Sequence, residues 1–388
     1  MSFPSSVEIL IVGAGPVGLA LASELSRRRV PHFIVDQLAA GANTSRACVV
    51  HARTLEVLEP LGVVPELLAR GVKVPIFRVR DRDRPLITID FRELPSPHAY
   101  TLMVPQSDTE AVLLAGLEAR GGRVVRPCTL ISARADADGM TATLRNANGD
   151  HVVRTRYLAG CDGSRSAVRE QAAIAFEGGS YEEAFVLADV RMDWPLSREE
   201  VTLFYSPAGL VVVAPMPNQR FRVVATIDTA PPVPTIGDIQ SLLDERGPEA
   251  TQARVRDVVW GSRFHIHHRV AATLRKGPIL ILGDAAHVHS PAGGQGMNTG
   301  IQDAVALGAA LAAVVERRDD PALAAWAKQR LQVARDVVRL TDRMTRAATI
   351  ENRFAQAVRN TAVQIVGSVP PARHAIAMKL SELAQRAA

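Results

Sequence analysis

The sequence reads VEILIVGAGPVGLALASELSRRRVPHFIVD from residue 7 to residue 36. Residues 7–12 form a short apolar run rich in β-branched side chains, residues 17–29 place apolar side chains at helical spacing, and residues 33–35 are apolar again. This pattern predicts a strand, a turn, a helix and a second strand, which together make one βαβ unit of a parallel sheet. The turn carries the sequence GAGPVG at residues 13–18.

Each glycine of this turn meets a steric requirement of a dinucleotide-binding βαβ unit. Gly13 permits the tight turn, Gly15 lets the backbone approach a pyrophosphate, and Gly18 lets the helix pack against the strand. The helix opens with Pro16 and points its N-terminus at the phosphates. Asp36 follows the second strand and can accept hydrogen bonds from a ribose. The unit therefore predicts a bound dinucleotide and leaves NAD and FAD open.

Composition and charge limit the class of protein. The chain has 388 residues, 47% of them apolar, which is enough for two globular units. The net charge of +5 is spread along the chain, so no nucleic-acid partner is predicted. The three cysteines are odd in number, far apart and never in a C-x-x-C pair, so they predict neither a disulfide framework nor a metal site. Residues 9–22 are apolar but follow Glu8 and contain glycines, so we interpret them as a buried strand and helix, and we expect a cytoplasmic protein without integral membrane association.

The pattern of the sequence changes along the chain and predicts an α/β fold. Residues 74–91 and 183–227 alternate apolar and charged positions, as half-buried antiparallel strands do. Residues 279–282 are wholly apolar, which is typical of a strand buried on both faces of a parallel sheet. The predicted parts are a Rossmann-like nucleotide-binding domain (1–72, 106–175 and 275–315), an inserted, mostly antiparallel β-sheet domain for the substrate (73–105 and 176–274) and a C-terminal helical region (316–388).

A second motif, LGDAAHVHSPAGGQGMNTG, runs from residue 282 to residue 300. Asp284 follows the apolar strand at its carboxyl end, where open α/β sheets bind ligands and where a carboxylate can hold a sugar or ribityl hydroxyl. The glycines within residues 293–296 expose backbone N–H groups at the start of a predicted helix. Such a helix end stabilises an anion.

Three shorter stretches accompany these two motifs. Residues 159–166 read AGCDGSRS, which by itself indicates a polar loop before a capped helix. Residues 45–47 read SRA and follow the second strand, and Gln106 opens a predicted helix four residues before Glu110. By themselves, Arg46 and Gln106 read as a surface arginine and a helix-start glutamine.

Taken together, these motifs resemble the para-hydroxybenzoate hydroxylase family of single-component FAD monooxygenases, which includes phenol, polyketide and rifampicin hydroxylases. The resemblance covers nearly the whole chain. It implies that the glycine turn binds the ADP half of FAD, that Asp284 touches the ribityl chain, and that residues 291–298 lie against the isoalloxazine. The predicted cofactor-binding residues are Gly13, Gly15, Pro16, Gly18, Asp36, Arg46, Gln106, Asp162, Gly163, Gly283, Asp284, Pro291, Gly294, Gly296, Met297 and Asn298.

The sequence also departs from the family pattern. Asp36 stands where many relatives have glutamate, and Cys161 stands where a smaller residue is common. The sequence stops at Ala388, so we expect no thioredoxin-like C-terminal domain of the kind found in the larger phenol hydroxylases. Oligomerisation is therefore not carried over from those relatives, and we expect a monomer or a homodimer.

The resemblance implies that NADPH or NADH reduces FAD, that O2 then forms a hydroperoxide at flavin C4a, and that this species hydroxylates a small aromatic or polyketide-type substrate. The flavin carries the chemistry, and the protein supplies position, a dry pocket and a helix dipole near the reduced ring. With one nucleotide fingerprint in the chain, the nicotinamide is expected to bind transiently. A flavin oxidoreductase without oxygen insertion, a Baeyer–Villiger or drug-inactivating oxygenase, and a flavin-binding protein without turnover remain alternatives.

The substrate pocket is expected between residues 291–298 and the inserted sheet, where residues 201–205 and 210–216 alternate. Its predicted lining is Phe204, Tyr205, Val213, Pro215, Met216 and Pro291. Tyr205 and His289 are the two candidates for a substrate base, and neither is decisive.

Two further patterns are interpreted structurally. His265, His267 and His268 do not all share one strand face and have no neighbouring acid cluster, so they predict no metal site. Residues 372–387 are expected to form an amphipathic helix that packs on the FAD domain.

Overall fold

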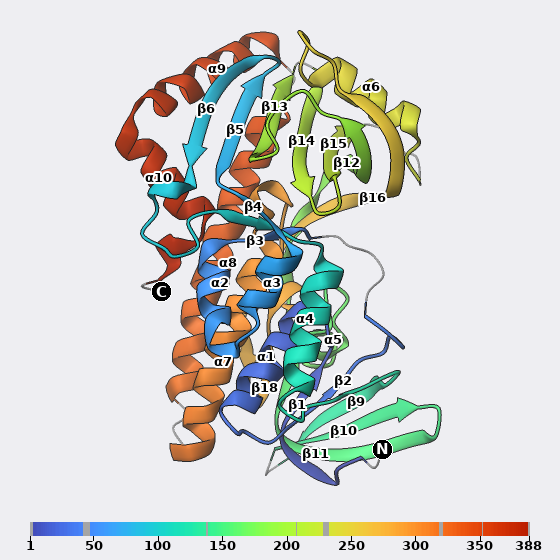
Figure 1. The fold of residues 1–388 in the computed structure, drawn as a ribbon. Helices are drawn as coiled ribbons and strands as arrows, with labels where there is room; N and C mark the ends of the chain where they lie inside the picture. The colour runs from blue at the N-terminus through green and yellow to red at the C-terminus, as the bar shows by residue number, and fades with distance from the viewer. Residues whose placement is uncertain are drawn as a thin grey trace.

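The computed structural model describes residues 3–41, 47–136, 139–206, 208–227, 233–317, 321–350 and 352–386. Two eight-stranded sheets dominate this part of the chain, one at the bottom and one at the top of Figure 1, with helices packed between them. The mixed α/β architecture and the C-terminal helical segment confirm the predicted fold class.

The first sheet contains the predicted βαβ unit. Its strands are β1 (Ser6–Val12), β2 (His32–Val35), β8 (Val124–Val125), β9 (Thr129–Asp136), β10 (Gly139–Asn146), β11 (Gly149–Gly160), β17 (Arg275–Lys276) and β18 (Ile279–Ile281). The main order is β17-β18-β11-β1-β2-β8, and β10 and β9 continue from β11. Ile9, Leu10 and Ile11 of β1 are fully buried, because the parallel part of the sheet is covered on both faces.

The register of the parallel strands brings their carboxyl ends to one edge. Val12 of β1 lies beside Val35 of β2 and Gly160 of β11, and Gly160 lies beside Ile281 of β18. The chain segments that leave these four strands therefore start close together. At this edge lie the glycine turn, Asp36 and the beginnings of the other two motifs.

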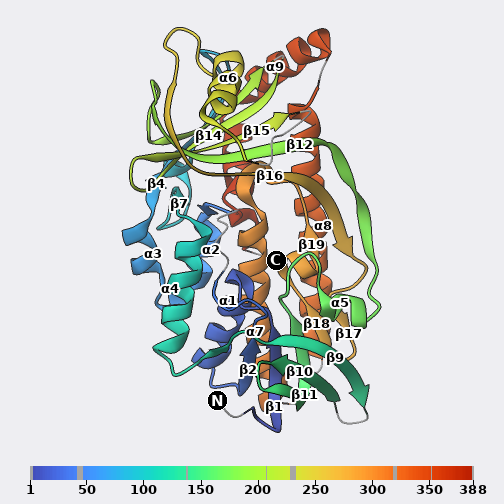
Figure 2. The same ribbon diagram turned by 90° about the vertical axis from the view of Figure 1, so that its right-hand side faces the viewer.

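Helices pack against this sheet and against one another (Figure 2). They are α1 (Pro16–Arg27), α2 (Ala52–Leu58), α3 (Val64–Arg70), α4 (Gln106–Glu118), α5 (Ala167–Gln171) and α7 (Gly296–Arg317). α1 lies along both α7 and α4. α7 begins within the glycine-rich loop, the name we use for residues 291–298.

The second sheet is assembled from separate parts of the chain. Its strands are β5 (Ile76–Asp81), β6 (Arg84–Asp90), β12 (Phe176–Asp193), β13 (Glu200–Ser206), β14 (Gly209–Met216), β15 (Arg220–Ile227), β16 (Arg254–Ala271) and β19 (His287–Val288), in the order β19-β16-β12-β15-β14-β13-β5-β6. Helix α6 (Ile236–Arg246) covers one face through Ile239, Leu242 and Leu243. The opposite face packs against the C-terminal helices.

A small third sheet lies between the two large ones. It consists of β3 (Val49–Val50), β7 (Thr101–Met103) and β4 (Val72–Val74), in that order. It thus pairs strands from segments that the sequence assigned to different domains. Short 3-10 turns complete the described elements: η1 (Glu59–Leu61), η2 (Phe91–Glu93), η3 (Gly283–Ala285), η4 (Ala292–Gly294) and η5 (Leu383–Gln385).

Three helices follow α7 at the C-terminal end. They are α8 (Pro321–Ala348), α9 (Arg353–Ser368) and α10 (Pro370–Leu380). The predicted helix over residues 372–387 is too long at its C-terminal end. It ends at Leu380 because Glu382 adopts a left-handed backbone with φ +60°, which a right-handed helix cannot contain.

One described helix, Ala292–Glu316, is long and apolar enough to cross a membrane by length and composition. It corresponds to α7 and the turn before it, and most of its apolar stretch is buried inside the protein. Ile301, Ala304 and Leu307 are fully buried in the core that α7 shares with α1. The apolar side chains of this helix are therefore used in the protein's own core.

Candidate functional site

The glycine turn has the geometry of a phosphate-binding turn. Gly13 has φ +101°, and a Cβ there would lie 2.3 Å from the carbonyl oxygen of Cys161. A Cβ on Gly18 would lie 1.9 Å from the carbonyl oxygen of Gly13. A Cβ on Gly15 would meet nothing within 4 Å, so the backbone there faces open space. Two glycines close the turn, and the third leaves room for a ligand.

Asp36 organises this turn from the next strand. Its carboxylate accepts hydrogen bonds from the backbone N–H of Ala14 at 2.6 Å and of Leu38 at 2.7 Å. Arg126, which sequence reasoning missed, donates from Nη2 to the carbonyl of Ala14 at 2.8 Å. An isolated arginine 112 residues away from its partner carries no local signal, so only the tertiary structure reveals it.

The motif at residues 159–166 forms a buried cap. Ser166 caps α5 by accepting from the N–H of Arg169 at 3.0 Å, and its hydroxyl donates to Asp162 at 2.5 Å. Burial raises the pKa of Asp162, although the hydrogen bond from Ser166 opposes that shift. Arg169 donates to the carbonyl of Ala285 at 3.0 Å and so ties this cap to η3. Gly163 has φ +79° in the same turn.

The motif at residues 282–300 begins where η3 and α7 pack closely against α1. Gly283 has φ +59°, and a Cβ there would lie 2.9 Å from Cγ2 of Val17. A Cβ on Gly300 would lie 2.7 Å from the same atom. The start of α1 thus packs tightly between η3 and α7. Asp284 is exposed at this edge, next to the glycine turn.

The glycine-rich loop is held by residues that are far away in the sequence. The side-chain amide of Asn298 donates to the carbonyls of Val49 at 2.9 Å and Gly294 at 2.7 Å, and its oxygen accepts from the N–H of His51 at 2.8 Å. Nε2 of His51 donates to the carbonyl of Gly293 at 2.7 Å. Burial lowers the pKa of His51 to about 4, so its ring is neutral near pH 7.

The loop ends in backbone N–H groups that are free to bind a ligand. Gly293 and Gly294 have φ +77° and +65°, which lets the chain turn sharply into α7. The N–H groups of Gly296, Met297 and Asn298 have no acceptor among the described residues. They form the positive end of a 22-residue helix, which attracts an anionic or electron-rich group.

Two histidines lie beside the loop. Nε2 of His287 is 2.7 Å from the carboxylate of Asp303, which also accepts from Arg330 at 2.5 Å. The ring of His289 lies 2.9 Å from the carbonyl of Ser290 through Nδ1, and its Nε2 is buried without a partner among the described residues. Because a carbonyl can only accept, Nδ1 carries the proton and Nε2 is an acceptor. Burial lowers the pKa of His289 to about 4.

Two further residues, Arg46 and Gln106, were predicted to contact the cofactor from outside the longer motifs. Arg46 lies outside the described residues. Gln106 starts α4, accepts from the N–H of Ala47 at 3.2 Å and donates to Glu110 at 2.9 Å. Gln106 therefore anchors the chain directly after residue 46.

The predicted pocket residues do not share one face of the second sheet. Phe204 and Val213 pack in the core beneath α6. Alternation along β14 puts Pro215 on the same side as Val213. Tyr205 and Met216 lie on the opposite face, where the guanidinium of Arg359 stands 4.3 Å from the Tyr205 ring. The prediction from alternation alone thus grouped residues from both faces of the second sheet into one pocket.

A buried ion pair on that opposite face was missed. Arg222 on β15 donates to Asp189 on β12 at 2.7 and 2.8 Å, and the two residues are register partners. Burial raises the pKa of the neighbouring Cys48 thiol, while Arg222 opposes the shift. In sequence both residues read as ordinary polar positions of half-exposed strands.

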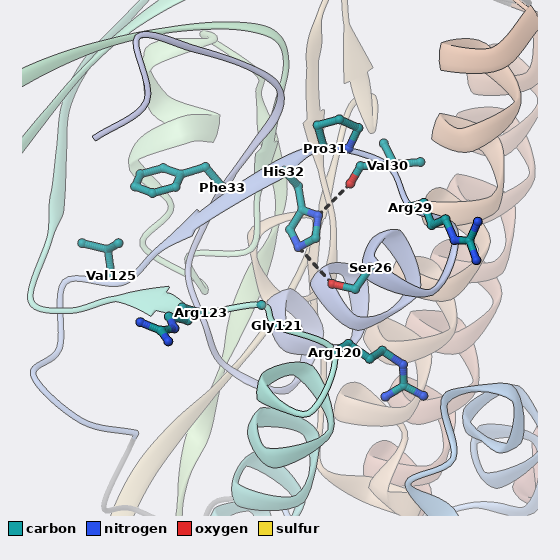
Figure 3. A pocket seen from close by; sticks show the side chains of 11 residues that line it. Ser26, Arg29, Val30, Pro31, His32, Phe33, Arg120, Gly121, Arg123 and Val125 are labelled. Atoms are coloured by element: carbon teal, nitrogen blue, oxygen red, sulfur yellow. Dashed lines mark hydrogen bonds between the residues drawn. The ribbon is translucent and has the colours of Figure 1, made fainter. Parts of the chain in front are cut away.

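A separate hollow of about 420 Å³ lies away from this edge (Figure 3). It lies at the start of β2, and its lining includes Arg29, Arg120 and Arg123. The His32 ring at its centre already contacts the Val30 carbonyl at 2.9 Å and the Ser26 hydroxyl at 3.4 Å. The motifs lie at the carboxyl end of β2, so this hollow is not part of the same site.

Comparison with known proteins agrees with this geometry. The FAD binding domain family matches residues 6–341. The 6-methylpretetramide 4-monooxygenase of Streptomyces rimosus is 35% identical over 376 residues, which are 95% of this chain and 67% of that protein. The pentachlorophenol 4-monooxygenase of Sphingobium chlorophenolicum is 34% identical over 80% of this chain and 58% of its own length. The chain thus spans about three fifths to two thirds of these relatives.

Solved structures give the same result. The p-nitrophenol 4-monooxygenase of Pseudomonas putida has a TM-score of 0.88 over 99% of this chain and 100% of its own, and at 23% identity it shows the fold alone. The anhydrotetracycline hydroxylase of Streptomyces rimosus has a TM-score of 0.81 at 30% identity, over 97% of this chain and 76% of its own. The chain therefore belongs to the FAD binding domain family, in which its relatives are flavin-dependent monooxygenases of aromatic and polyketide compounds.

Proposed function

We propose that this protein uses FAD, NADPH or NADH, and O2 to hydroxylate a small aromatic or polyketide-type substrate. The observation that carries the proposal is the meeting of three elements at one sheet edge. These are the open glycine turn, the exposed carboxylate of Asp284 and the free N–H groups at the start of α7. The named relatives act on compounds of this kind.

The described residues fit FAD. Open space at Gly15 is free for a pyrophosphate, and we propose that the exposed carboxylate of Asp284 binds the ribityl chain. We propose that Asp36 keeps the turn in shape while its remaining acceptor capacity meets the ribose, since two backbone N–H groups already occupy part of it. Asp162 and Gly163 support the same edge through the cap of α5. We propose Arg46 and Gln106 as further contacts.

When bound, FAD supplies the redox chemistry and the reaction with oxygen. The protein's own residues supply electrostatics and exclusion of water. The N–H groups of Gly296, Met297 and Asn298 stabilise negative charge that develops on a ring held against the loop. The buried side chains of Asn298 and His51 keep those donors in place.

We propose that the substrate lies between the glycine-rich loop and the second sheet. Pro291 forms one side, and Tyr205 and Met216 lie on the face of the sheet opposite α6. Phe204, Val213 and Pro215 lie on the other face of the sheet, on the side of α6, so we propose that they do not line the pocket. Arg222 and Asp189 add polar groups to the same face as Tyr205.

We propose His289 over Tyr205 as the group that accepts the proton of a substrate hydroxyl. The Nδ1 contact of His289 fixes its tautomer and leaves a lone pair on Nε2. Nε2 would lie 3.6 Å from a Cβ on Gly296, beside the free donors of α7. Burial raises the pKa of Tyr205, so its phenol keeps its proton near neutral pH and cannot accept another, whereas the neutral His289 ring keeps a free lone pair although burial makes it a weak base. We further propose a cytoplasmic monomer or homodimer.

The test is an oxygen-incorporation assay on the purified protein. Bound FAD is identified after heat release, and a panel of phenols and polyketide phenols is then supplied with NADPH or NADH under ¹⁸O2. A substrate that accelerates nicotinamide oxidation and gains one ¹⁸O atom supports the proposal. Nicotinamide oxidation that reduces a substrate without ¹⁸O gain would indicate an oxidoreductase instead. A protein that cannot be loaded with FAD would overturn the proposal altogether.

A further inference from the structure

The chain turns back into the protein after α10. Leu380 ends the helix, and Ser381 follows it with a carbonyl that accepts from the N–H of Arg53 on α2 at 3.2 Å. Glu382 is fully buried and has φ +60°. A left-handed backbone is strained at a residue other than glycine, and burial of a carboxyl group is a further energetic cost. Contacts around Glu382 must therefore hold it there.

Those contacts come from the helix that carries the free donors. Thr299 of α7 donates from Oγ1 to Glu382 at 3.2 Å, and Gln302 of α7 donates from Nε2 to the same carboxyl group. Thr54 of α2 lies 3.5 Å away through its hydroxyl and also accepts from Gln302 at 3.1 Å. The side chain of Glu382 thus joins the first two turns of α7 to α2.

Leu380 contacts the glycine-rich loop itself. Its carbonyl accepts from Nε2 of Gln295 at 3.1 Å. Its Cδ2 atom would lie 3.6 Å from a Cβ on Gly293. Leu380, Ser381 and Glu382, which we call the C-terminal clasp, therefore touch both the loop and the helix that the loop precedes.

Charged groups and a small cavity surround Glu382. Asp303 on α7, Arg330 on α8 and His287 on β19 form the adjacent buried cluster. Burial raises the pKa of the Glu382 carboxyl to about 8, although the bond from Thr299 and the charge of Arg330 oppose that shift. A cavity of about 170 Å³ lies next to this cluster and is lined in part by Gln302, Arg330 and Gln385.

We propose that the C-terminal clasp holds the glycine-rich loop in its FAD-binding conformation and that Glu382 is the positioning residue of this clasp. The proposal rests on the proposed FAD site, because the clasp acts through Thr299, Gln302 and Gln295. Glu382 does not touch the cofactor. Thr299 and Gln302 donate to the Glu382 oxygens in either protonation state, but burial penalises the ionised form, which has no direct cationic partner among the described residues.

The test measures FAD affinity by quenching of flavin fluorescence between pH 6 and pH 9. Glu382→Ala is expected to raise the Kd for FAD at least tenfold at every pH, because α7 loses both bonds. The wild-type protein is expected to bind FAD about tenfold more weakly at pH 9 than at pH 6. Glu382→Gln is expected to match the wild type at pH 6 and to lose this pH dependence. Arg386→Ala is the matched control, since Arg386 pairs with Glu56 on α2 and contacts neither α7 nor the loop.

A purely structural role for Glu382 would lower the melting temperature of the apo-protein without changing the pH profile of the Kd. That result, or a Glu382→Ala variant with wild-type affinity, would overturn the proposal. Failure of the monooxygenase assignment is separate, because these titrations need no substrate and no turnover. A wild-type protein that binds no FAD would refute the proposed function first.

Discussion

The glycine turn at residues 13–18 and the glycine-rich loop at residues 291–298 lie near the same edge of the first sheet, but different interactions hold them in place. The turn is closed by its own glycines and by Asp36, only 22 residues beyond its partner Ala14. The loop is held by His51, 242 residues before its partner Gly293, and by the C-terminal clasp. The turn is thus a local structure, whereas the loop depends on the whole fold. Perturbations should therefore separate binding of the ADP half of FAD from binding of its ring.

The largest effect is expected at Gly18. A Cβ in Gly18→Ala would lie 1.9 Å from the carbonyl oxygen of Gly13, and neither backbone can move without shifting β1. We expect the free energy of unfolding of the apo-protein to fall by about 4 kcal/mol or more, measured by urea denaturation.

Gly15→Ala is the matched control for that variant. Its Cβ meets nothing within 4 Å, so the free energy of unfolding should change by less than about 1 kcal/mol. Affinity for ADP and FAD should still fall, because the methyl group occupies the space for the pyrophosphate. Equal destabilisation by both substitutions would contradict the geometry of the turn.

The second effect separates the turn from the loop. Asn298→Ala removes three hydrogen bonds, to Val49, Gly294 and His51, and leaves their buried partners unsatisfied. We expect a loss of about 3 kcal/mol in the free energy of unfolding and a Kd for FAD at least tenfold higher. The Kd for ADP should stay within a factor of two, because the turn does not use Asn298. Parallel weakening of ADP and FAD binding would show that the two regions are coupled.

The smallest effect is a dependence on pH that belongs to the loop. Burial lowers the pKa of His51 from its ordinary value to about 4, so the unfolded chain takes up a proton before the folded one does. This contribution to stability is complete above about pH 7 and is lost as the pH falls toward 4. Between pH 7 and pH 5 we expect a loss of about 2 kcal/mol that His51→Gln removes. Urea denaturation of the wild type and of His51→Gln at pH 7 and pH 5 measures this loss. An equal loss of unfolding free energy in the two proteins would contradict its assignment to His51.

Part of this site was predictable from sequence because its signals are local. The βαβ unit, the position of Asp284 after an apolar strand and the helix after residue 296 depend on the spacing of neighbouring residues. The pocket was less predictable. Alternation along β13 and β14 places residues on two faces but does not say which face turns to the loop, so Phe204 and Tyr205 were grouped although they point to opposite sides.

The amino-acid sequence was sufficient for the fold class, the cofactor motifs and the family, because each of them is written in short patterns of glycine, apolar and acidic residues. Only the tertiary structure revealed the long-range partners that hold the turn, the glycine-rich loop and the second sheet in place. Arg126, His51, Arg222 and Glu382 act across separations as large as the 328 residues between Thr54 and Glu382. No periodicity spans such a distance. Contacts of this kind exist only after the chain has folded and brought these segments together.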